Sequence, residues 1–220
     1  AGGCATGTYY RAGEGLVGSW FALVAYATTA AASKTGLLSG VTTWVKGLWV
    51  TDLTTIPATI GLPSWGGVVI LASITGVVVH RFVVLERSRP TQIQLPAQRT
   101  GLTHLLLEKQ WNPLVTGFLV GVVAVIAWPT SWASGRPDGL GITTPSSNLV
   151  NLIVTGDTKR LDWGVLLVLG ILLGSYVAAK ASGEFRVRVP SAQVIQRSIA
   201  GGVLMGIGAV WAGGCSIGNA

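Results

Sequence analysis

Residues 65–85 read WGGVVILASITGVVVHRFVVL, and this stretch decides which solvent the chain folds in. It is as long as the about 20 apolar residues that a helix needs to cross a membrane, and Arg81 is its one charged side chain. The whole chain agrees with it, because 50% of its 220 residues are hydrophobic and 10% are charged, whereas soluble domains carry about 25% charged residues. The composition excludes soluble, disordered, collagen-like and disulfide-framework proteins, and it predicts an all-α, polytopic helical membrane protein.

Apolar runs with almost no charge predict five membrane-spanning helices, several of them short enough to be tilted or broken. The predicted spans are residues 16–32, 65–85, 113–128, 163–179 and 198–211.

Two further apolar stretches, residues 37–60 and 139–156, are interrupted by charges, prolines or hydroxyl residues. We expect both to contain broken, re-entrant half-helices, which are tolerated at membrane depth only where protein or a cavity satisfies their ends. In the second stretch, Thr144 and Pro145 are typical of an N-cap followed by the first helical residue.

Basic residues predict how the chain is oriented in the membrane. The net charge of +7 results from 15 Lys and Arg against 8 Asp and Glu. Most of the bases lie in connecting loops, which favours membrane topology over nucleic-acid binding. Two clusters follow the second and the fourth span: Arg81, Arg87, Arg89, Arg99 and Lys109, then Lys180, Arg186, Arg188 and Arg197. Both loops are therefore predicted to be cytoplasmic, and the loop between the third and fourth spans is predicted to lie outside.

The same octapeptide pattern occurs twice. Residues 1–8 read AGGCATGT and residues 212–219 read AGGCSIGN, which predicts an internal duplication. An odd number of crossings between the motifs makes the repeats inverted, whereas a full crossing by residues 37–60 would make them parallel. We divide the chain into the C-terminal part of a first repeat (1–87), a cytoplasmic inter-repeat linker (88–110) and the N-terminal part of a second repeat (111–220). The duplication also predicts an intact protein of roughly 400 residues, with parts missing here at both ends.

Each octapeptide holds a cysteine among glycines, and these motifs form the candidate site. The candidate residues are Cys4, Cys215, Gly3, Gly7, Gly214 and Gly218. A glycine-rich break that leads into a helix presents unpaired N–H groups and the positive end of the helix dipole, which suits a small anion. A thiol there would suit the soft terminal sulfur of an oxyanion while N–H groups bind its oxygens.

Other features near the motifs have more than one interpretation. Arg11 either pairs with Glu14 at the membrane interface or attracts an anion at the pore mouth. The two cysteines could instead be small buried side chains at helix crossings, or form one disulfide. A zinc or iron–sulfur site is not expected, because the cysteines and the two histidines match no ligand spacing, and no cofactor is predicted.

Glycine pairs at 117/121, 170/174 and 202/206 are typical of close helix packing.

The cysteine motifs resemble those of the YeeE/YedE family of sulfur-transport membrane proteins, whose signature is a Gly-Cys-x-x-Gly hinge repeated in two halves. The matching residues are GCATG at 3–7, YRAGE at 10–14 and GGCSIG at 213–218, and also WNP at 111–113 with Gly117 and Gly121. The resemblance implies an importer of thiosulfate in the bacterial inner membrane, and not an enzyme. In such a protein Cys4 and Cys215 would pass the ion along by transient hydrogen bonds at the membrane midplane. It further implies a cytoplasmic TusA-like sulfur carrier as a partner, besides membrane lipid.

Three alternatives stay open on the sequence. A membrane thiol or sulfurtransferase-type redox protein would need a reactive thiolate, and would normally show a Cys-x-x-Cys pair or a nearby histidine. A transporter of selenium compounds would carry the same residues. A structural subunit of a larger complex would tolerate the loss of both cysteines.

Overall fold

The computed structural model describes residues 3–48, 61, 63–87, 111–136 and 138–215. The chain divides into two compact units, of which the larger comprises Ala1–Lys46 and Arg99–Ala220 and the smaller Gly47–Gln98. The predicted linker, residues 88–110, lies outside the described residues. The division into repeats at 1–87 and 111–220 stays a prediction.

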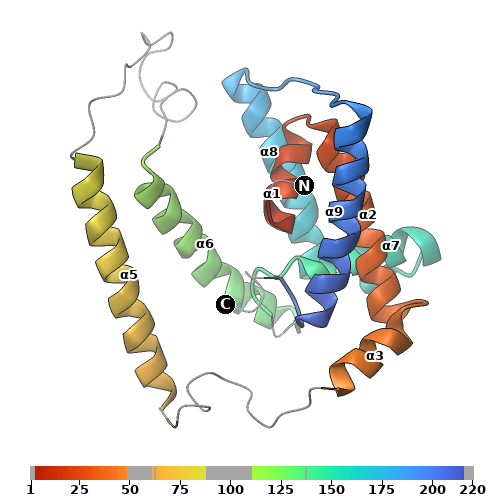
Figure 1. Cartoon of the computed structure of the whole chain (residues 1–220), viewed down its shortest axis with the longest axis horizontal. Coiled ribbons are helices and arrows are strands. Elements are labelled where there is room, and N and C mark those ends of the chain that lie inside the picture. The colour runs from red at the N-terminus through yellow and green to blue at the C-terminus, as the bar shows by residue number, and fades with distance from the viewer. Residues whose placement is uncertain (1–2, 49–60, 62, 88–110, 137, 216–220) are drawn as a thin grey trace. The chain divides into compact units, whose positions relative to one another are not determined.

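Every regular element in these ranges is a helix, which confirms the all-α class. The smaller unit contains α5 (Ser64–Arg87), and α3 (Ser39–Gly47) ends at the boundary between the units. The larger unit contains α1 (Ala5–Gly13), α2 (Val17–Thr35), α6 (Pro113–Ala133), α7 (Thr143–Thr155), the short 3₁₀ helix η2 (Thr158–Arg160), α8 (Trp163–Ser182) and α9 (Ala192–Trp211). Its packed part is a bundle in which α2 lies against α9 and α7, and α1 lies against α8 and α2 (Figure 1).

Four of the five predicted spans coincide with helices that are long and apolar enough to cross a membrane, as judged on the described residues. These helices are Trp65–Leu85, Pro113–Ala133, Trp163–Ser182 and Ala192–Trp211. The remaining predicted span, residues 16–32, also forms a helix, α2, which has 19 residues but is not among the four. One face of α2, which includes Ser19, Ser33 and most of its alanines, is buried against protein, since α2 packs against α1, α7 and α9. A helix that contacts other helices instead of lipid does not need an apolar surface all round.

The stretch 139–156 contains the predicted short helix, α7, which has 13 residues. At 1.5 Å per residue it is about 20 Å long and too short to cross a core of about 30 Å. The predicted cap is wrong, because the N-cap is Ile142 and Pro145 is the third residue of the helix. Contacts from distant elements, described below, fix this start earlier than the local sequence signal. In the other interrupted stretch, residues 37–60, α3 forms a nine-residue helix. Residues 49–60 lie outside the described part.

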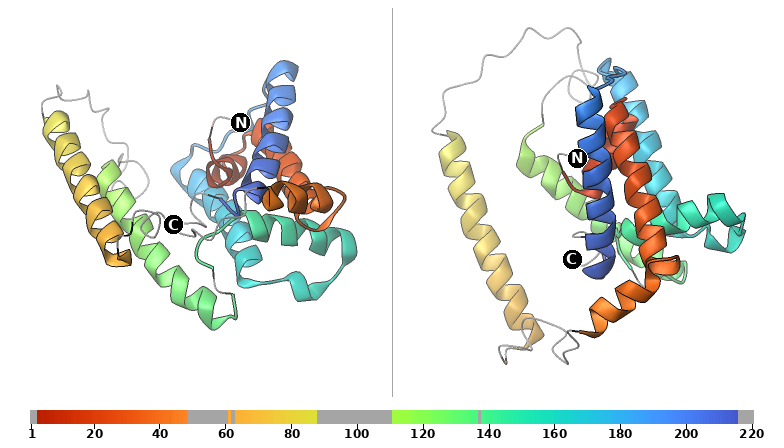
Figure 2. Two further views of the ribbon diagram at one scale, coloured as in Figure 1. Left: turned by 60° about the horizontal axis from the view of Figure 1, so that its bottom comes forward. Right: turned by 45° about the vertical axis from the view of Figure 1, so that its right-hand side comes forward.

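Two glycines allow α9 to pack closely on α2, and the two helices run side by side in both views of Figure 2. A Cβ on Gly202 would collide with the carbonyl oxygen of Ala22, and a Cβ on Gly206 would lie 2.8 Å from the carbonyl oxygen of Tyr26. Close packing is thus confirmed for the pair 202/206. The pairs 117/121 and 170/174 have open space beside them in the part of the chain that is described, so they do not serve helix packing there.

Candidate anion site

Cys4 is the N-cap residue of α1, so the first glycine-rich motif leads directly into a helix. Its backbone is extended, and its carbonyl oxygen accepts hydrogen bonds from the amide and the hydroxyl of Thr8, each at 3.0 Å. The thiol is exposed. A Cβ on Gly7 would lie 3.9 Å from Sγ of Cys4, so this glycine leaves space beside the thiol. The start of α1 therefore presents first-turn amides and a free thiol together.

Cys215 follows α9 after a glycine turn. α9 ends at Trp211, and Gly213 has φ +83°, in the left-handed region that favours glycine. After this turn Cys215 packs against a buried cluster that includes Tyr9, Tyr26 and Ile142. Its thiol is half-buried, and neither Cys215 nor Cys4 takes part in a disulfide.

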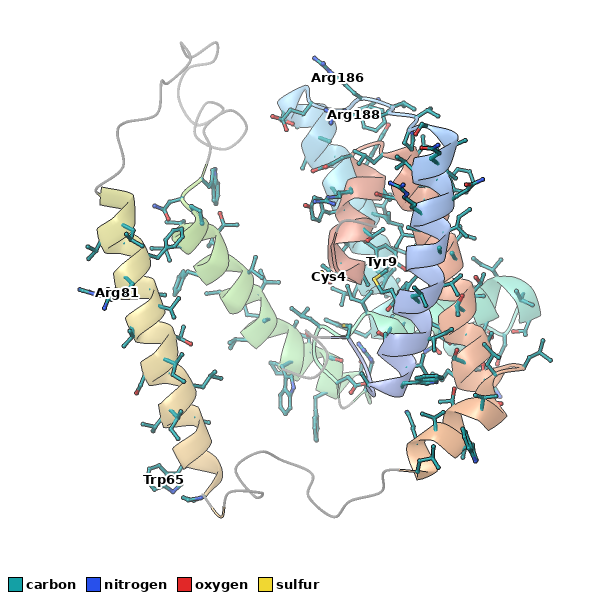
Figure 3. All side chains as sticks on the ribbon, viewed as in Figure 1. Cys4, Tyr9, Trp65, Arg81, Arg186 and Arg188 are labelled. Carbon is teal, nitrogen blue, oxygen red and sulfur yellow. The ribbon has the colours of Figure 1, made fainter. Side chains whose placement is uncertain are left out.

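The fold brings the two cysteine motifs together from distant parts of the chain. Ala5, next to Cys4, belongs to the same buried cluster that Cys215 contacts. Tyr26 of α2 belongs to this cluster too. Figure 3 shows Cys4 at the level of the middle of α9, whereas Arg186 and Arg188 lie at the end of the bundle. Cys4 thus lies within the length of the helices, away from these arginines.

The first turn of α7 is the third element of this site. The amide of Ile142 donates a hydrogen bond to Sγ of Cys215 at 3.4 Å. The hydroxyl of Tyr26 donates to Oγ1 of Thr143 at 2.9 Å, and the oxygens of Tyr9 and Ser146 are 2.8 Å apart. These contacts tie the start of α7 to α1, to α2 and to the second cysteine motif.

Arg136 holds the segment that leads into α7. Its buried guanidinium donates hydrogen bonds to the carbonyl oxygens of Gly139, at 3.3 Å, and Gly141, at 3.2 Å. The carboxylate of Asp138 lies 3.6 Å from its Nε. On the other side α8 packs against it, since a Cβ on Gly164 would lie 2.8 Å from a guanidinium nitrogen. The loop that presents Ile142 to Cys215 is thereby fixed on two sides.

The assembled groups suit a small anion that has one soft end. The starts of α1 and α7 carry partial positive charge and amides that have no partner within their own helix. The two thiols are polarizable and can donate weak hydrogen bonds. Among the residues described, no three His, Cys, Asp or Glu side chains come together in a geometry that could hold a metal ion. The groups that the described residues bring to the site are amides, hydroxyls and thiols.

The remaining candidate residues are placed as follows. Gly214 directly precedes Cys215, and Gly3 directly precedes Cys4 with open space beside it. Gly218 lies outside the described residues. Arg11 lies in the last turn of α1, with its guanidinium carbon 5.9 Å from the ring centroid of Tyr10. It is thus at the opposite end of α1 from Cys4 and does not join the cysteines.

The sequence pattern did not identify Tyr9, Tyr26, Ile142 or Thr143 as members of the site. One signal was available, because the hydroxyl-rich run TTPSS at 143–147 needs hydrogen-bond partners at membrane depth. That signal does not name the partners. Ile142 and Cys215 are 73 residues apart in the sequence, and no periodicity connects them.

The chain is similar to a known family and to two proteins of that kind. The family described as "Sulphur transport" matches residues 1–220. The chain is 50% identical over 219 residues to the thiosulfate transporter TsuA of Escherichia coli (strain K12), and the match covers 100% of this chain and 61% of that protein. It is 35% identical over 233 residues to the thiosulfate transporter TsuA of Spirochaeta thermophila, covering 100% of this chain and 64% of that protein. The chain thus spans less than two thirds of the length of either relative.

These matches confirm the resemblance that the cysteine motifs carry. Together with the four apolar helices, they identify a multi-pass membrane protein of a bacterial inner membrane. The chain belongs to the sulphur transport family.

Proposed function

We propose that this chain forms part of an importer of thiosulfate, and that Cys4, Cys215 and the start of α7 form its substrate site. The observation that carries the proposal is the hydrogen bond from the amide of Ile142 to Sγ of Cys215. It joins a helix start, which attracts an anion, to a thiol, which suits a soft sulfur atom. The two relatives are named as thiosulfate transporters, which supports the choice of anion.

Recognition in this proposal is non-covalent. The first-turn amides of α1 and α7 bind the oxygens of thiosulfate, and the two thiols contact its terminal sulfur through weak hydrogen bonds. The ion passes from one cysteine to the other because each contact is weak enough to break, which conduction through successive sites requires. No bond of the substrate is made or broken.

Direction and architecture belong to the same proposal. The two cysteine motifs are inverted repeats with the substrate near the membrane midplane, as in transporters whose binding site is built from discontinuous helices. The basic connector between α8 and α9 is cytoplasmic by the positive-inside rule, so import runs from the cysteines toward Arg186 and Arg188. A soluble TusA-like sulfur carrier would accept the ion on that side.

The test uses the full-length protein in bacteria that lack their own thiosulfate importers, with thiosulfate as the sole sulfur source. Growth and labelled uptake are compared for wild type, Cys4→Ala and Cys215→Ala at equal membrane levels. Ser73→Ala is the matched control, because Ser73 is exposed on α5 and its hydroxyl donates to the carbonyl oxygen of Val69 in the same helix. The proposal predicts that both cysteine variants lose uptake and that the control keeps it.

Two results would contradict the proposal. If wild type does not restore growth, the substrate is wrong, and selenium compounds become the next candidates. If mass spectrometry of the intact protein during uptake finds a persulfide or mixed disulfide on Cys4 or Cys215, the mechanism is covalent, as in a sulfurtransferase-type protein.

A further inference from the structure

The α1–α2 turn pairs with the connector between α8 and α9 at one end of the bundle. Leu16 and Arg188 form an isolated parallel bridge. The amide of Val17 donates to the carbonyl oxygen of Arg188 at 3.1 Å, and the amide of Arg188 donates to the carbonyl oxygen of Gly15 at 3.0 Å. Gly15 has φ +99°, and a Cβ on it would lie 2.7 Å from the carbonyl oxygen of Arg186. The backbone of the connector is therefore held in one position against the end of α1.

Two cavities adjoin this junction, and both include Leu16 and Arg188 in their walls. One has a volume of about 430 Å³ and is lined by two carboxylates, Glu14 and Glu184, together with two arginines. The other has a volume of about 360 Å³ and is lined by Arg11 and Arg188, with no carboxylate in its walls. Two carboxylates line the first cavity, whereas the described residues that line the second include none, so the second is the more favourable of the two for an anion.

Polar groups other than the arginines also favour an anion in the second cavity. Residues of the first turns of α2 and α9 line it, and a helix start carries partial positive charge. Ser19 and Ser198 line it too, with relative exposures of 8% and 7%. No hydrogen bond of either hydroxyl is found within the described residues, so both can donate to a ligand. Apolar residues such as Pro190 and Val194 form the remaining wall.

We infer that this cavity is a second anion site, which binds the transported oxyanion on the cytoplasmic side after it leaves the cysteines. The inference rests on the proposed function. Cys4 is at the start of α1 and Arg11 is in its last turn, so the helix separates the two sites by about 10 Å at 1.5 Å per residue. Arg188 is the residue that we test, because it lies exposed in the connector, where its charge draws the anion out of the bundle toward water.

The experiment measures labelled thiosulfate uptake by the full-length protein in liposomes of neutral lipid, as a function of thiosulfate concentration. Arg188→Gln removes the charge, Arg188→Lys restores it, and Ser19→Ala removes one hydroxyl. Arg186→Gln is the control, because it makes the same charge change two residues away, in the wall of the first cavity only. We expect Arg188→Gln to lower uptake at subsaturating thiosulfate about tenfold, since a hydrogen-bonded ion pair with the ligand is lost, and Arg188→Lys to recover part of it. Ser19→Ala should cause a smaller loss, and Arg186→Gln none.

The outcomes separate this inference from the proposed function. If wild type does not take up thiosulfate, the proposed function fails. If wild type transports, Cys4→Ala does not, and Arg188→Gln matches Arg186→Gln, the cytoplasmic anion site is wrong while the cysteine site stands. The shared chemistry of an oxyanion also fits a lipid phosphate, so the assay is repeated with phosphatidylglycerol in the liposomes. A loss of uptake in Arg188→Gln that appears only with this anionic lipid would assign the cavity to a headgroup and overturn the inference.

Discussion

The amide of Ile142 donates a hydrogen bond to Sγ of Cys215 across 3.4 Å. This contact links the start of a helix that is too short to cross the membrane with a cysteine that follows a helix long enough to do so. It fixes where α7 begins and also where the thiol lies. One interaction thus serves the packing of the bundle and the geometry of the anion site.

Replacement of Cys215 by valine should destabilise the protein more than replacement by serine. Serine keeps an acceptor for the amide of Ile142, whereas valine leaves that amide without a partner, which costs about 1–3 kcal/mol. Thermal unfolding of the full-length protein in detergent, followed by size exclusion, measures the difference. Equal unfolding temperatures for the two variants would show that the amide does not depend on residue 215.

Tyr26→Phe should lower stability by about 1 kcal/mol and reduce thiosulfate uptake. The change removes the fully buried hydroxyl that donates to Oγ1 of Thr143 at 2.9 Å. The start of α7 then loses one of the hydrogen bonds that fix its position. Tyr10→Phe is the matched control, since Tyr10 is 41% exposed. The explanation fails if both phenylalanine variants behave alike in the same heating and uptake assays.

Gly202→Leu should separate α2 from α9. No space exists for a Cβ between Gly202 and the backbone of Ala22, and overpacking of this kind costs about 1–3 kcal/mol. Gly208→Ala on the same helix has open space beside it, and should be neutral or stabilising by up to about 1 kcal/mol because alanine favours a helix over glycine. The amount of folded protein recovered from membranes after heating should fall for Gly202→Leu and not for Gly208→Ala. An unchanged yield for Gly202→Leu would contradict the packing described here.

Asp162→Ala should destabilise the start of α8 by about 1–2 kcal/mol, as the loss of an N-cap does. One carboxylate oxygen accepts from the amide of Val165 at 2.9 Å, and the other accepts from the side chain of Asn148 on α7 at 3.0 Å. Asp157→Ala is the comparison, because that residue caps the exposed three-residue helix η2 and should cost less. Similar unfolding temperatures for the two variants would mean that the link from α7 to α8 contributes nothing.

The sequence alone was enough to predict the membrane-crossing helices and the start of α6, because these depend on the residues of each segment itself. The crossing helices follow from apolar runs, and the start of α6 follows from Asn112 and Pro113, where the side chain of Asn112 accepts from the amide of Leu114 at 2.8 Å. The start of α7 was predicted wrongly from Thr144 and Pro145. There the contacts of Ile142 and Thr143 with distant residues outweigh the local cap preference.

The candidate site could be predicted only in part for the same reason. The repeated octapeptide identifies Cys4 and Cys215, because a repeat can be found by comparing the sequence with itself. The residues that contact the thiols cannot be found in this way. Tyr26 reaches Thr143 across 117 positions and Tyr9 reaches Ser146 across 137 positions, and only the folded bundle places them together.

The central claim is that the thiols of Cys4 and Cys215 recognise the terminal sulfur of thiosulfate. Its most direct test is competition, in which uptake of labelled thiosulfate by the full-length protein in liposomes is measured with a large excess of unlabelled sulfate. Sulfate has oxygens for the amides but no soft sulfur for the thiols, so we predict that it leaves uptake nearly unchanged while unlabelled thiosulfate abolishes it. Equal competition by sulfate and thiosulfate would contradict the claim.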